Sequence, residues 1–355
     1  MKRTALIIVL LGLYINTFSQ KGMDTYDKNY YCMVGYLHPQ SVIESYNNWE
    51  LLMTLKGGKS ITELNKSGVK YSKNQIEILR LLNFVELKED KYYSTISILN
   101  ENETNELRLE TKIISNNIVN LINKDYNSFQ QILTKQGFKN NVYTLLFSYV
   151  MDNLVWDKLE KLNYKTMREL TVEQPFWSGT LWFMNPKRKF SCGTNSMSFD
   201  SIENTKFCIN WSKNSGVSFS NFNIIESMLK DFKKNAIVTD TVVKNVLKAY
   251  DLCNTDGLLK FPVIKNDSTN ELNHYSNIIA NIITNYLVNN IDYNQVLKKY
   301  KIKDKEVAII ILFHEIMWDI LDILEEKGQL KKPIAFSDPK NSKKTDLKDL
   351  IYIIE

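Results

Sequence analysis

Histidine is scarce in this chain of 355 residues, and one of its three histidines, His314, directly precedes Glu315 in an apolar, helix-like stretch that also contains Asp319. An imidazole beside a carboxylate can carry out acid–base catalysis or bind zinc. In zinc peptidases a second histidine follows four residues after the first, but here that position is Trp318. His314, Glu315 and Asp319 are therefore weak catalytic candidates for a hydrolase. The alternative is a polar pair satisfied by its helix neighbours. The sequence predicts no metal site and no cofactor.

Aromatic and basic side chains gather in residues 171–221, where alternating apolar residues indicate strands. Exposed aromatic groups next to cations are typical of surfaces that recognise a peptide, a sugar or an acidic group. The alternative is a small sheet that joins the two halves of the chain, since tryptophan is usually largely buried. The candidate binding residues are Phe176, Trp177, Trp182, Lys187, Arg188 and Asn195.

The chain contains four cysteines. Cys192 and Cys208 both lie in the strand-like part of residues 171–221, with turn residues between them. In an exported protein a disulfide between these two is possible, although buried free cysteine is also common.

Three helices and a hairpin can be recognised in residues 45–100, and the first helix is the short amphipathic stretch from Trp49 to Leu55. Ser60 and Glu63 form one capping box, and Ser72 and Gln75 form a second. A hairpin-like alternation follows from Phe84 to Ile98. The order of three helices and a two-stranded wing resembles the winged-helix domain of many bacterial transcriptional regulators.

That resemblance implies a nucleic-acid site on the third helix and the wing. Its residues would be Lys70, Lys73, Asn74, Gln75, Arg80, Lys88 and Lys91. Acidic residues dilute the positive charge there, Glu77 and Glu86 among them, and specific DNA sites usually neutralise several phosphates. The alternative is a winged helix that serves only as a packing scaffold.

An internal repeat organises the rest of the chain. The tetrapeptide at 104–107, Thr-Asn-Glu-Leu, recurs at 269–272, 165 positions later, and similar blocks follow in the same order. The match extends to residues 145–151 and 311–317, at an offset of 166. We interpret the pattern as a duplication in which each copy is a winged-helix unit followed by amphipathic helices.

The helices that follow the first winged unit are expected near 104–124, 127–136 and 140–163, and those of the second near 269–289, 293–300 and 303–327. The segments 177–182 and 192–196 between winged units resemble a group of uncharacterised bacterial winged-helix (helix-turn-helix) proteins of similar length. That resemblance supports the architecture and supplies no catalytic residues.

The first nineteen residues have the pattern of a signal peptide. Lys2 and Arg3 precede an apolar run from Thr4 to Ile15, which is too short for a typical membrane span. Cleavage is expected after Ser19, with an uncleaved anchor as the alternative. Removal of the two basic residues lowers the net charge from +5 to +3, which does not favour an obligatory polyanionic partner. We therefore predict a periplasmic or secreted protein.

Together these patterns predict a mainly α protein with small β elements (α+β), made of a duplicated winged-helix-plus-helices unit with a β-rich aromatic insert between the halves. The expected parts are a signal peptide (1–19), an N-terminal extension (20–44), a winged-helix-like domain (45–100), a helical region (101–170), the insert (171–221), a diverged second repeat (222–330) and a Lys-rich tail (331–355).

The preferred function is a non-enzymatic binding or interaction protein that uses the insert to bind a protein, a peptide or a small ligand. One alternative is a DNA-binding regulator, if the leader is not a true signal. The other is a hydrolase that uses His314.

Overall fold

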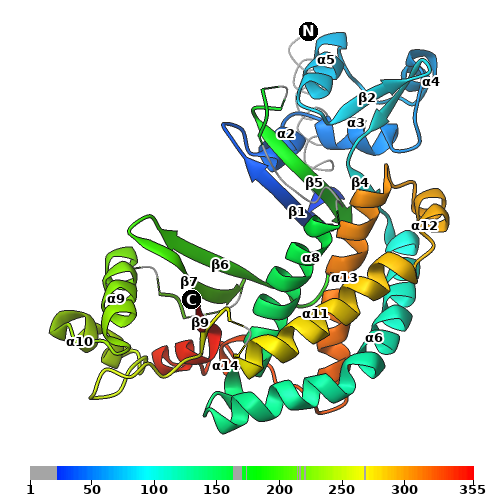
Figure 1. The fold of residues 1–355 in the computed structure, drawn as a ribbon. Helices are drawn as coiled ribbons and strands as arrows, with labels where there is room; N and C mark the ends of the chain where they lie inside the picture. The colour runs from blue at the N-terminus through cyan, green and yellow to red at the C-terminus, as the bar shows by residue number, and fades with distance from the viewer. Residues whose placement is uncertain are drawn as a thin grey trace. The chain divides into compact units, whose positions relative to one another are not determined.

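The computed structural model describes residues 22–162, 170–172, 174–213, 215, 217–219, 221–267 and 269–355, so the predicted signal peptide lies outside the described part. The protein is mixed α/β, 54% helical and 17% strand, with several small sheets (Figure 1). The chain divides into two compact, discontinuous units. Unit 1 contains residues 1–111, 164–189 and 291–315, and unit 2 contains residues 112–163, 190–290 and 316–355.

The sheet of unit 1 has three strands in the order β1-β5-β4. They are β1 (Asp27–Val34), β5 (Trp177–Met184) and β4 (Ser97–Leu99). The central strand β5 runs antiparallel to β1 and parallel to β4. Because β5 is apolar at most of its positions, it is buried almost throughout, and it contributes Trp177, Leu181 and Phe183 to the core of this unit.

Short helices and a hairpin connect β1 to β4. They are α2 (Pro39–Glu44), α3 (Asn48–Leu55), α4 (Ile61–Lys66), α5 (Lys73–Leu81), β2 (Val85–Lys88) and β3 (Lys91–Ser94). Both expected capping boxes form, at Ser60 with Glu63 and at Ser72 with Gln75. A bridge between Lys59 and Tyr92 adds a short third partner to the β2–β3 hairpin.

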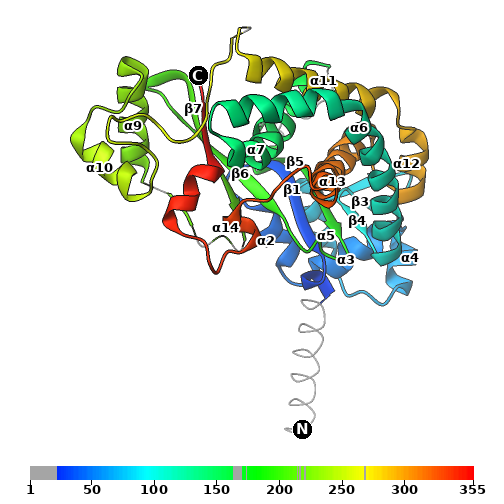
Figure 2. The same cartoon turned by 90° about the horizontal axis from the view of Figure 1, so that it is seen from below.

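The sheet of unit 2 has four strands in the order β6-β7-β9-β8. They are β6 (Cys192–Phe199), β7 (Ile202–Ser212), β9 (Ile351–Ile354) and β8 (Val263–Ile264). Helices α9 (Phe222–Asn235) and α10 (Thr241–Ala249) lie beside the β6–β7 hairpin (Figures 1 and 2). Among the described residues between β7 and β8 the helices are these two. The C-terminal apolar residues form the strand β9, which pairs with β7 and β8.

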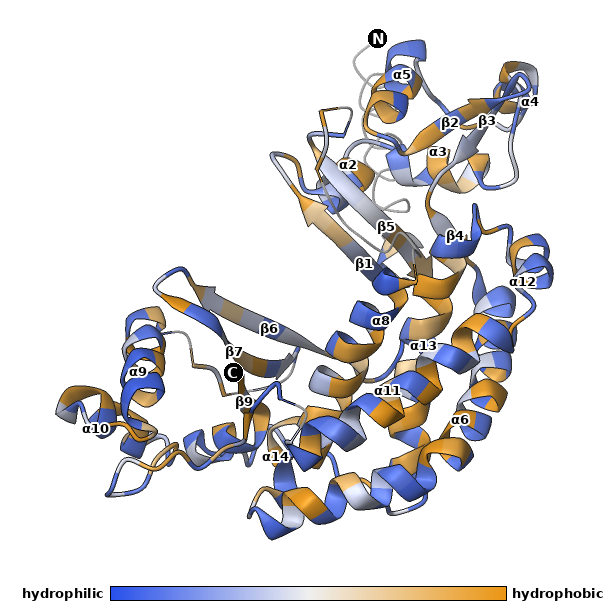
Figure 3. Ribbon diagram, in the orientation of Figure 1, coloured by the Kyte–Doolittle hydropathy of each residue, from blue (hydrophilic) through white to orange (hydrophobic). Residues whose placement is uncertain are grey.

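Further helices, some long and some of a single turn, complete both units. They are α6 (Glu101–Lys135), η1 (Lys139–Asn141), α7 (Val142–Thr144), the π-helix η2 (Leu145–Val155), α8 (Trp156–Lys161), α11 (Glu271–Asn289), α12 (Tyr293–Tyr300), α13 (Lys305–Glu326), α14 (Ile334–Ser337) and η3 (Lys344–Leu350). The helix α13 is hydrophobic along nearly all of its length (Figure 3), since both of its faces are buried. The two helices expected at 104–124 and 127–136 form the single helix α6, because no Gly or Pro interrupts the chain before Gly137.

The two sheets share one pattern of pairing. In unit 1, Met184 at the end of the central strand pairs with Asp27 on one side and with Leu99 on the other. In unit 2, Ile354 pairs in the same way with Lys206 and Ile264. Each central strand is antiparallel to the strand that precedes the short helices and parallel to the strand that follows them. Leu99 and Ile264 are 165 positions apart, the offset of the sequence repeat.

Two expectations about residues 171–221 are wrong. These residues do not form one insert, because β5 belongs to unit 1 whereas β6 and β7 belong to unit 2. The possible disulfide between Cys192 and Cys208 is also not formed, because the β6–β7 register places Cys192 opposite Ser212 and Cys208 opposite Ser196; both are buried free cysteines, which was the alternative. Both thiols are buried, and burial raises the pKa of each.

Candidate ligand-binding pocket

The predicted aromatic binding residues lie in the core of unit 1. Trp177 is 6% exposed, stacks on Phe84 and donates its indole N–H to the carbonyl oxygen of Leu82 at 2.8 Å. Trp182 is 1% exposed, and its ring centroid lies 4.7 Å from that of His314. Phe176 packs against the same core. These rings therefore hold the sheet to its surroundings and offer little surface to a ligand.

The remaining residues of that predicted site are dispersed. Lys187 is exposed in unit 1, the Arg188 side chain is largely buried in an ion pair, and Asn195 is exposed on β6 of unit 2. The sequence analysis grouped them as one site because they are close in the chain. Their assignment to different units could not be read from that spacing.

A buried ion-pair cluster explains the His314-Glu315 pair. One carboxylate oxygen of Glu315, Oε2, accepts from Arg108 Nε at 2.8 Å and from Arg188 Nε at 3.0 Å. Arg108 also donates to the carbonyl oxygen of Pro186, and Asp27 accepts from the backbone N–H of Arg188. Burial by itself would raise the pKa of Glu315, but the charges of Arg188 and Arg108 outweigh it and lower that pKa. A carboxylate held in this way is a poor general base near neutral pH.

The other two catalytic candidates lie on the same helix as Glu315. His314 Nδ1 lies 2.7 Å from the carbonyl oxygen of Ile310, one turn back on that helix, and its ring contacts Tyr31 and Trp182. Asp319 follows Glu315 by one turn of α13 and is buried. The arrangement favours the structural interpretation of His314.

Several of the candidate nucleic-acid residues are engaged within the protein. Gln75 donates to Asn47 and Asn48, at 2.9 and 2.7 Å. Arg80 pairs with Glu77, and Lys88 pairs with Glu86. Lys70, Lys73, Asn74 and Lys91 are exposed. The exposed side of α5 also carries the apolar side chains of Ile78 and Leu81, which are 56% and 69% exposed. A helix that reads DNA bases needs hydrogen-bonding side chains at such positions.

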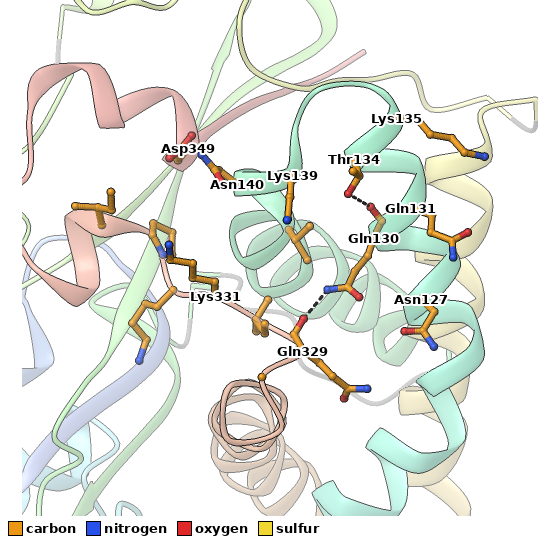
Figure 4. A pocket seen from close by; sticks show the side chains of 16 residues that line it. Asn127, Gln130, Gln131, Thr134, Lys135, Lys139, Asn140, Gln329, Lys331 and Asp349 are labelled. Atoms are coloured by element: carbon orange, nitrogen blue, oxygen red, sulfur yellow. Dashed lines mark hydrogen bonds between the residues drawn. The ribbon is translucent and has the colours of Figure 1, made fainter.

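A pocket of about 770 Å³ lies in the described part of unit 2, and its volume is within the range of small-molecule sites. The end of α6, η1 and the segment 328–334 form its walls (Figure 4). Its polar lining consists of four lysines (Lys135, Lys139, Lys331, Lys332), five amides (Asn127, Gln130, Gln131, Asn140, Gln329), Thr134 and Asp349.

Local sequence explains why these walls meet. Gly137 and Gly328 adopt positive φ angles of 84° and 67°, which end the helices α6 and α13 and turn the chain. The carbonyl oxygen of Gln329 then accepts from Gln130 Nε2 at 2.5 Å and from the hydroxyl of Tyr126 at 3.1 Å. These bonds fix the 328–330 turn against α6.

The pocket carries excess positive charge. Lys332 pairs with Glu325 at 2.9 Å and lies over the ring of Phe190. In the part of unit 2 that the structure describes, no carboxylate lies within ion-pair distance of Lys135, Lys139 or Lys331. Figure 4 shows Lys139 and Lys331 on opposite walls, while Lys135 points away from the hollow.

Asp349 is the acidic group of this pocket. Its side chain is 7% exposed, and burial raises its pKa to about 6, although Lys348 and a hydrogen bond from Asn140 lower it. Below that pH the carboxyl is neutral, and the lysines then dominate the local field. The arrangement can hold an anionic group between cations, with amides available to bond hydroxyl or carbonyl groups.

The sequence reasoning missed this pocket. It treated Lys331 as part of a solvated tail and did not examine the amides of α6. Two signals were available in the sequence: the helix-ending glycines Gly137 and Gly328, and the amide-rich pair Gln130-Gln131. In the structure a long-range hydrogen bond joins Gln130 to Gln329, directly after Gly328.

Within the described residues no group of three or more His, Cys, Asp or Glu side chains is arranged to hold a metal ion. None of the helices in the described part of the chain has the length and apolar character needed to cross a membrane. Comparison of the chain with protein-family models, with curated proteins and with solved structures finds no match.

Proposed function

We propose that this chain is an exported, non-enzymatic binding protein that holds a small anionic ligand in the pocket of unit 2. The observation that carries the proposal is the pair Lys139 and Lys331, which line a pocket of ligand size without a carboxylate partner in the described part of that unit. The amide lining suits a ligand that also has hydroxyl or carbonyl groups. This site replaces the aromatic insert as the preferred binding region.

The binding test compares a monosaccharide phosphate with the same unphosphorylated monosaccharide by isothermal titration calorimetry. The phosphate is expected to bind and the neutral sugar to bind at least tenfold more weakly. A charge-assisted hydrogen bond contributes about 1.5–3 kcal/mol, so Lys139→Ala with Lys331→Ala should weaken binding at least tenfold. Lys234→Ala, an exposed lysine on α9, is the matched control and should leave affinity unchanged. Equal binding of both sugars, or unchanged affinity in the double variant, would contradict the proposal.

Export rests on the leader, residues 1–19. A reporter enzyme that is active only outside the cytoplasm, fused to the C-terminus, should be active in cells with the intact leader and inactive when residues 2–19 are deleted. Cytoplasmic retention of the intact fusion would favour the DNA-binding alternative instead.

The duplication is likewise a proposal: each repeat would consist of a strand, a winged-helix-like unit, a second strand, helices and a closing strand. The shared register of the two sheets and the common offset of 165 between Leu99 and Ile264 support it. So do matched buried positions at that offset, such as Leu107 with Leu272 and Ile118 with Ile283. In the second repeat the winged-helix part is reduced to α9, α10 and the Cys253–Leu259 bridge.

A further inference from the structure

The two repeats contribute to each other's units. With the repeat boundary placed after Lys189, the second repeat provides α12 and the first part of α13 to unit 1. The first repeat in turn provides the larger part of α6, from Lys112 on, and the whole of η2 and α8 to unit 2.

In unit 1, the third helix of the second repeat, α13, contacts the sheet and the first long helix, α6, of the first repeat. His314 of α13 packs on Trp182 of β5, with ring centroids 4.7 Å apart. Its neighbour Glu315 accepts from Arg108 of α6 and from Arg188, which follows β5. Lys299 of α12 adds ion pairs to α6.

In unit 2 the roles of the repeats are reversed. Ser148 of η2 shares a hydrogen bond of 2.6 Å with the hydroxyl of Tyr352 on β9. The next residue, Tyr149, donates its hydroxyl proton to Asn273 of α11 at 2.8 Å. The helix partner of this sheet therefore comes from the first repeat.

These contacts occupy equivalent positions. Arg108 and Asn273 are 165 residues apart, and Tyr149 and Glu315 are 166 apart, the two offsets of the sequence repeat. Trp182 and Tyr352 both lie two rungs before the end of their central strand, as the shared register requires. The same pair of helices and the same strand position thus meet in both units, with an ion pair in unit 1 and a neutral hydrogen bond in unit 2.

We infer that each repeat is completed only by the third long helix of the other repeat, which is α13 for the first repeat and η2 with α8 for the second. The chain is then two interlocked partners joined covalently. We further infer that the ion pairs of Glu315 select this mixed pairing over the pairing of each repeat with itself. This inference rests on the proposed duplication and is independent of the ligand pocket. A first repeat paired with itself would place Tyr149 against Arg108 and Arg188, so that both guanidinium groups would lose the carboxylate of Glu315 and Arg108 would keep its longer contact with Asp27, at 3.7 Å. A second repeat paired with itself would place Glu315 against Asn273, without these arginines. Loss of the buried ion pairs of Glu315 disfavours both.

The first experiment cuts the whole folded protein at a protease site inserted between Lys189 and Phe190, on the boundary between the two units. The two fragments are expected to remain together as a 1:1 complex on size-exclusion chromatography with light scattering, and to separate only in denaturant. Separation into two folded monomers, recognised by retained circular dichroism and sharp unfolding, would overturn the exchange of helices. Separation into unfolded fragments supports it, because it shows that neither repeat is complete alone.

The second experiment tests the pairing code with the same cut protein, denatured and refolded. The original sequence should return only mixed complexes by native mass spectrometry. A variant with Arg108→Leu, Arg188→Leu and Glu315→Leu keeps the site filled without charge, so like-with-like pairs should appear beside mixed ones. Tyr149→Phe with Asn273→Leu is the matched control in unit 2 and should still give only mixed complexes. Exclusively mixed pairing in the uncharged variant would overturn the role of Glu315.

Discussion

The distant partners of the buried Glu315 change the interpretation of the local His314-Glu315 pattern. His314-Glu315 suggests catalysis when only neighbours in the chain are considered, because an imidazole and a carboxylate are common in active sites. The partners of Glu315 are Arg108 and Arg188, more than a hundred residues away in the sequence. Such partners follow from tertiary packing and could not be derived from spacing. The repeat did align His314-Glu315 with Ser148-Tyr149, which was the correct comparison even though the contacts were unknown.

Removal of the charge at Glu315 should be costly. Glu315→Gln removes the carboxylate that pairs with both Arg108 and Arg188, and removal of one partner of a buried ion pair typically costs about 3–5 kcal/mol of unfolding free energy. Because the folded pKa of Glu315 is lowered, its stabilising contribution is complete above the unfolded pKa and is lost as the pH falls through the folded pKa. Urea denaturation at pH 7 and pH 3 should therefore show a difference from the original protein that shrinks in acid. Tyr149→Phe, which removes a neutral hydrogen bond, should cost only about 1 kcal/mol at both pH values; equal costs would count against the ion-pair account.

Asp349 should respond to pH in the opposite sense. Its folded pKa, raised to about 6 by burial, lies above the unfolded value of 3.8, so ionisation opposes folding. The associated stability is present below pH 4 and is lost as the pH rises through about 6. Asp349→Asn should stabilise the protein at pH 7.5 by roughly 1–3 kcal/mol and change little at pH 3.5.

The same residue links pH to the pocket. A negative Asp349 in the lining of the same pocket opposes an incoming anion, so phosphate-bearing ligands should bind more weakly above pH 6 in the original protein and less so in Asp349→Asn. Titration calorimetry at pH 5 and pH 7.5 checks this. An unchanged pH dependence in the variant would separate Asp349 from ligand binding.

At the scale of elements, prediction succeeded where a single face of a helix or a cap determines the structure. The expected helix at 293–300 is α12 with the same bounds, and that at 303–327 is α13 within two residues. Both serine capping boxes were also predicted correctly. Prediction failed where distant segments share a sheet. The strands β5 and β6 follow one another in sequence yet belong to different sheets. The strand β5 pairs with β1 and β4, whereas β6 pairs with β7, which in turn pairs with the C-terminal strand β9.

The turns between elements should differ sharply in their tolerance of a side chain. Gly137 and Gly257 both adopt positive φ angles, 84° and 86°. A Cβ at Gly137 would meet nothing within 4 Å, whereas a Cβ at Gly257 would lie 2.0 Å from the carbonyl oxygen of Val238. Gly137→Ala should therefore cost about 1 kcal/mol, the price of the backbone conformation alone. Gly257→Ala should cost clearly more, over about 2 kcal/mol, because backbone atoms must move. Chemical denaturation of the two variants measures both values, and equal costs would contradict the local geometry around Val238.

At the scale of the whole molecule, chain connectivity should make the two units unfold together. Both long helices cross the boundary: α6 passes from unit 1 into unit 2 after Thr111, and α13 passes from unit 1 into unit 2 after Glu315. Chains with two separable cores usually unfold in steps, but here loss of either unit breaks helices that the other needs. Differential scanning calorimetry should give one transition, with a van't Hoff enthalpy close to the calorimetric enthalpy. Trp177→Ala, which removes a core ring of unit 1, should lower the midpoint of that single transition. A control substitution at an exposed site, Lys213→Ala, should leave it in place. If Trp177→Ala instead splits the trace into an early and an unshifted late transition, the two units unfold independently. The interlocked arrangement of the repeats then does not couple the stabilities of the units.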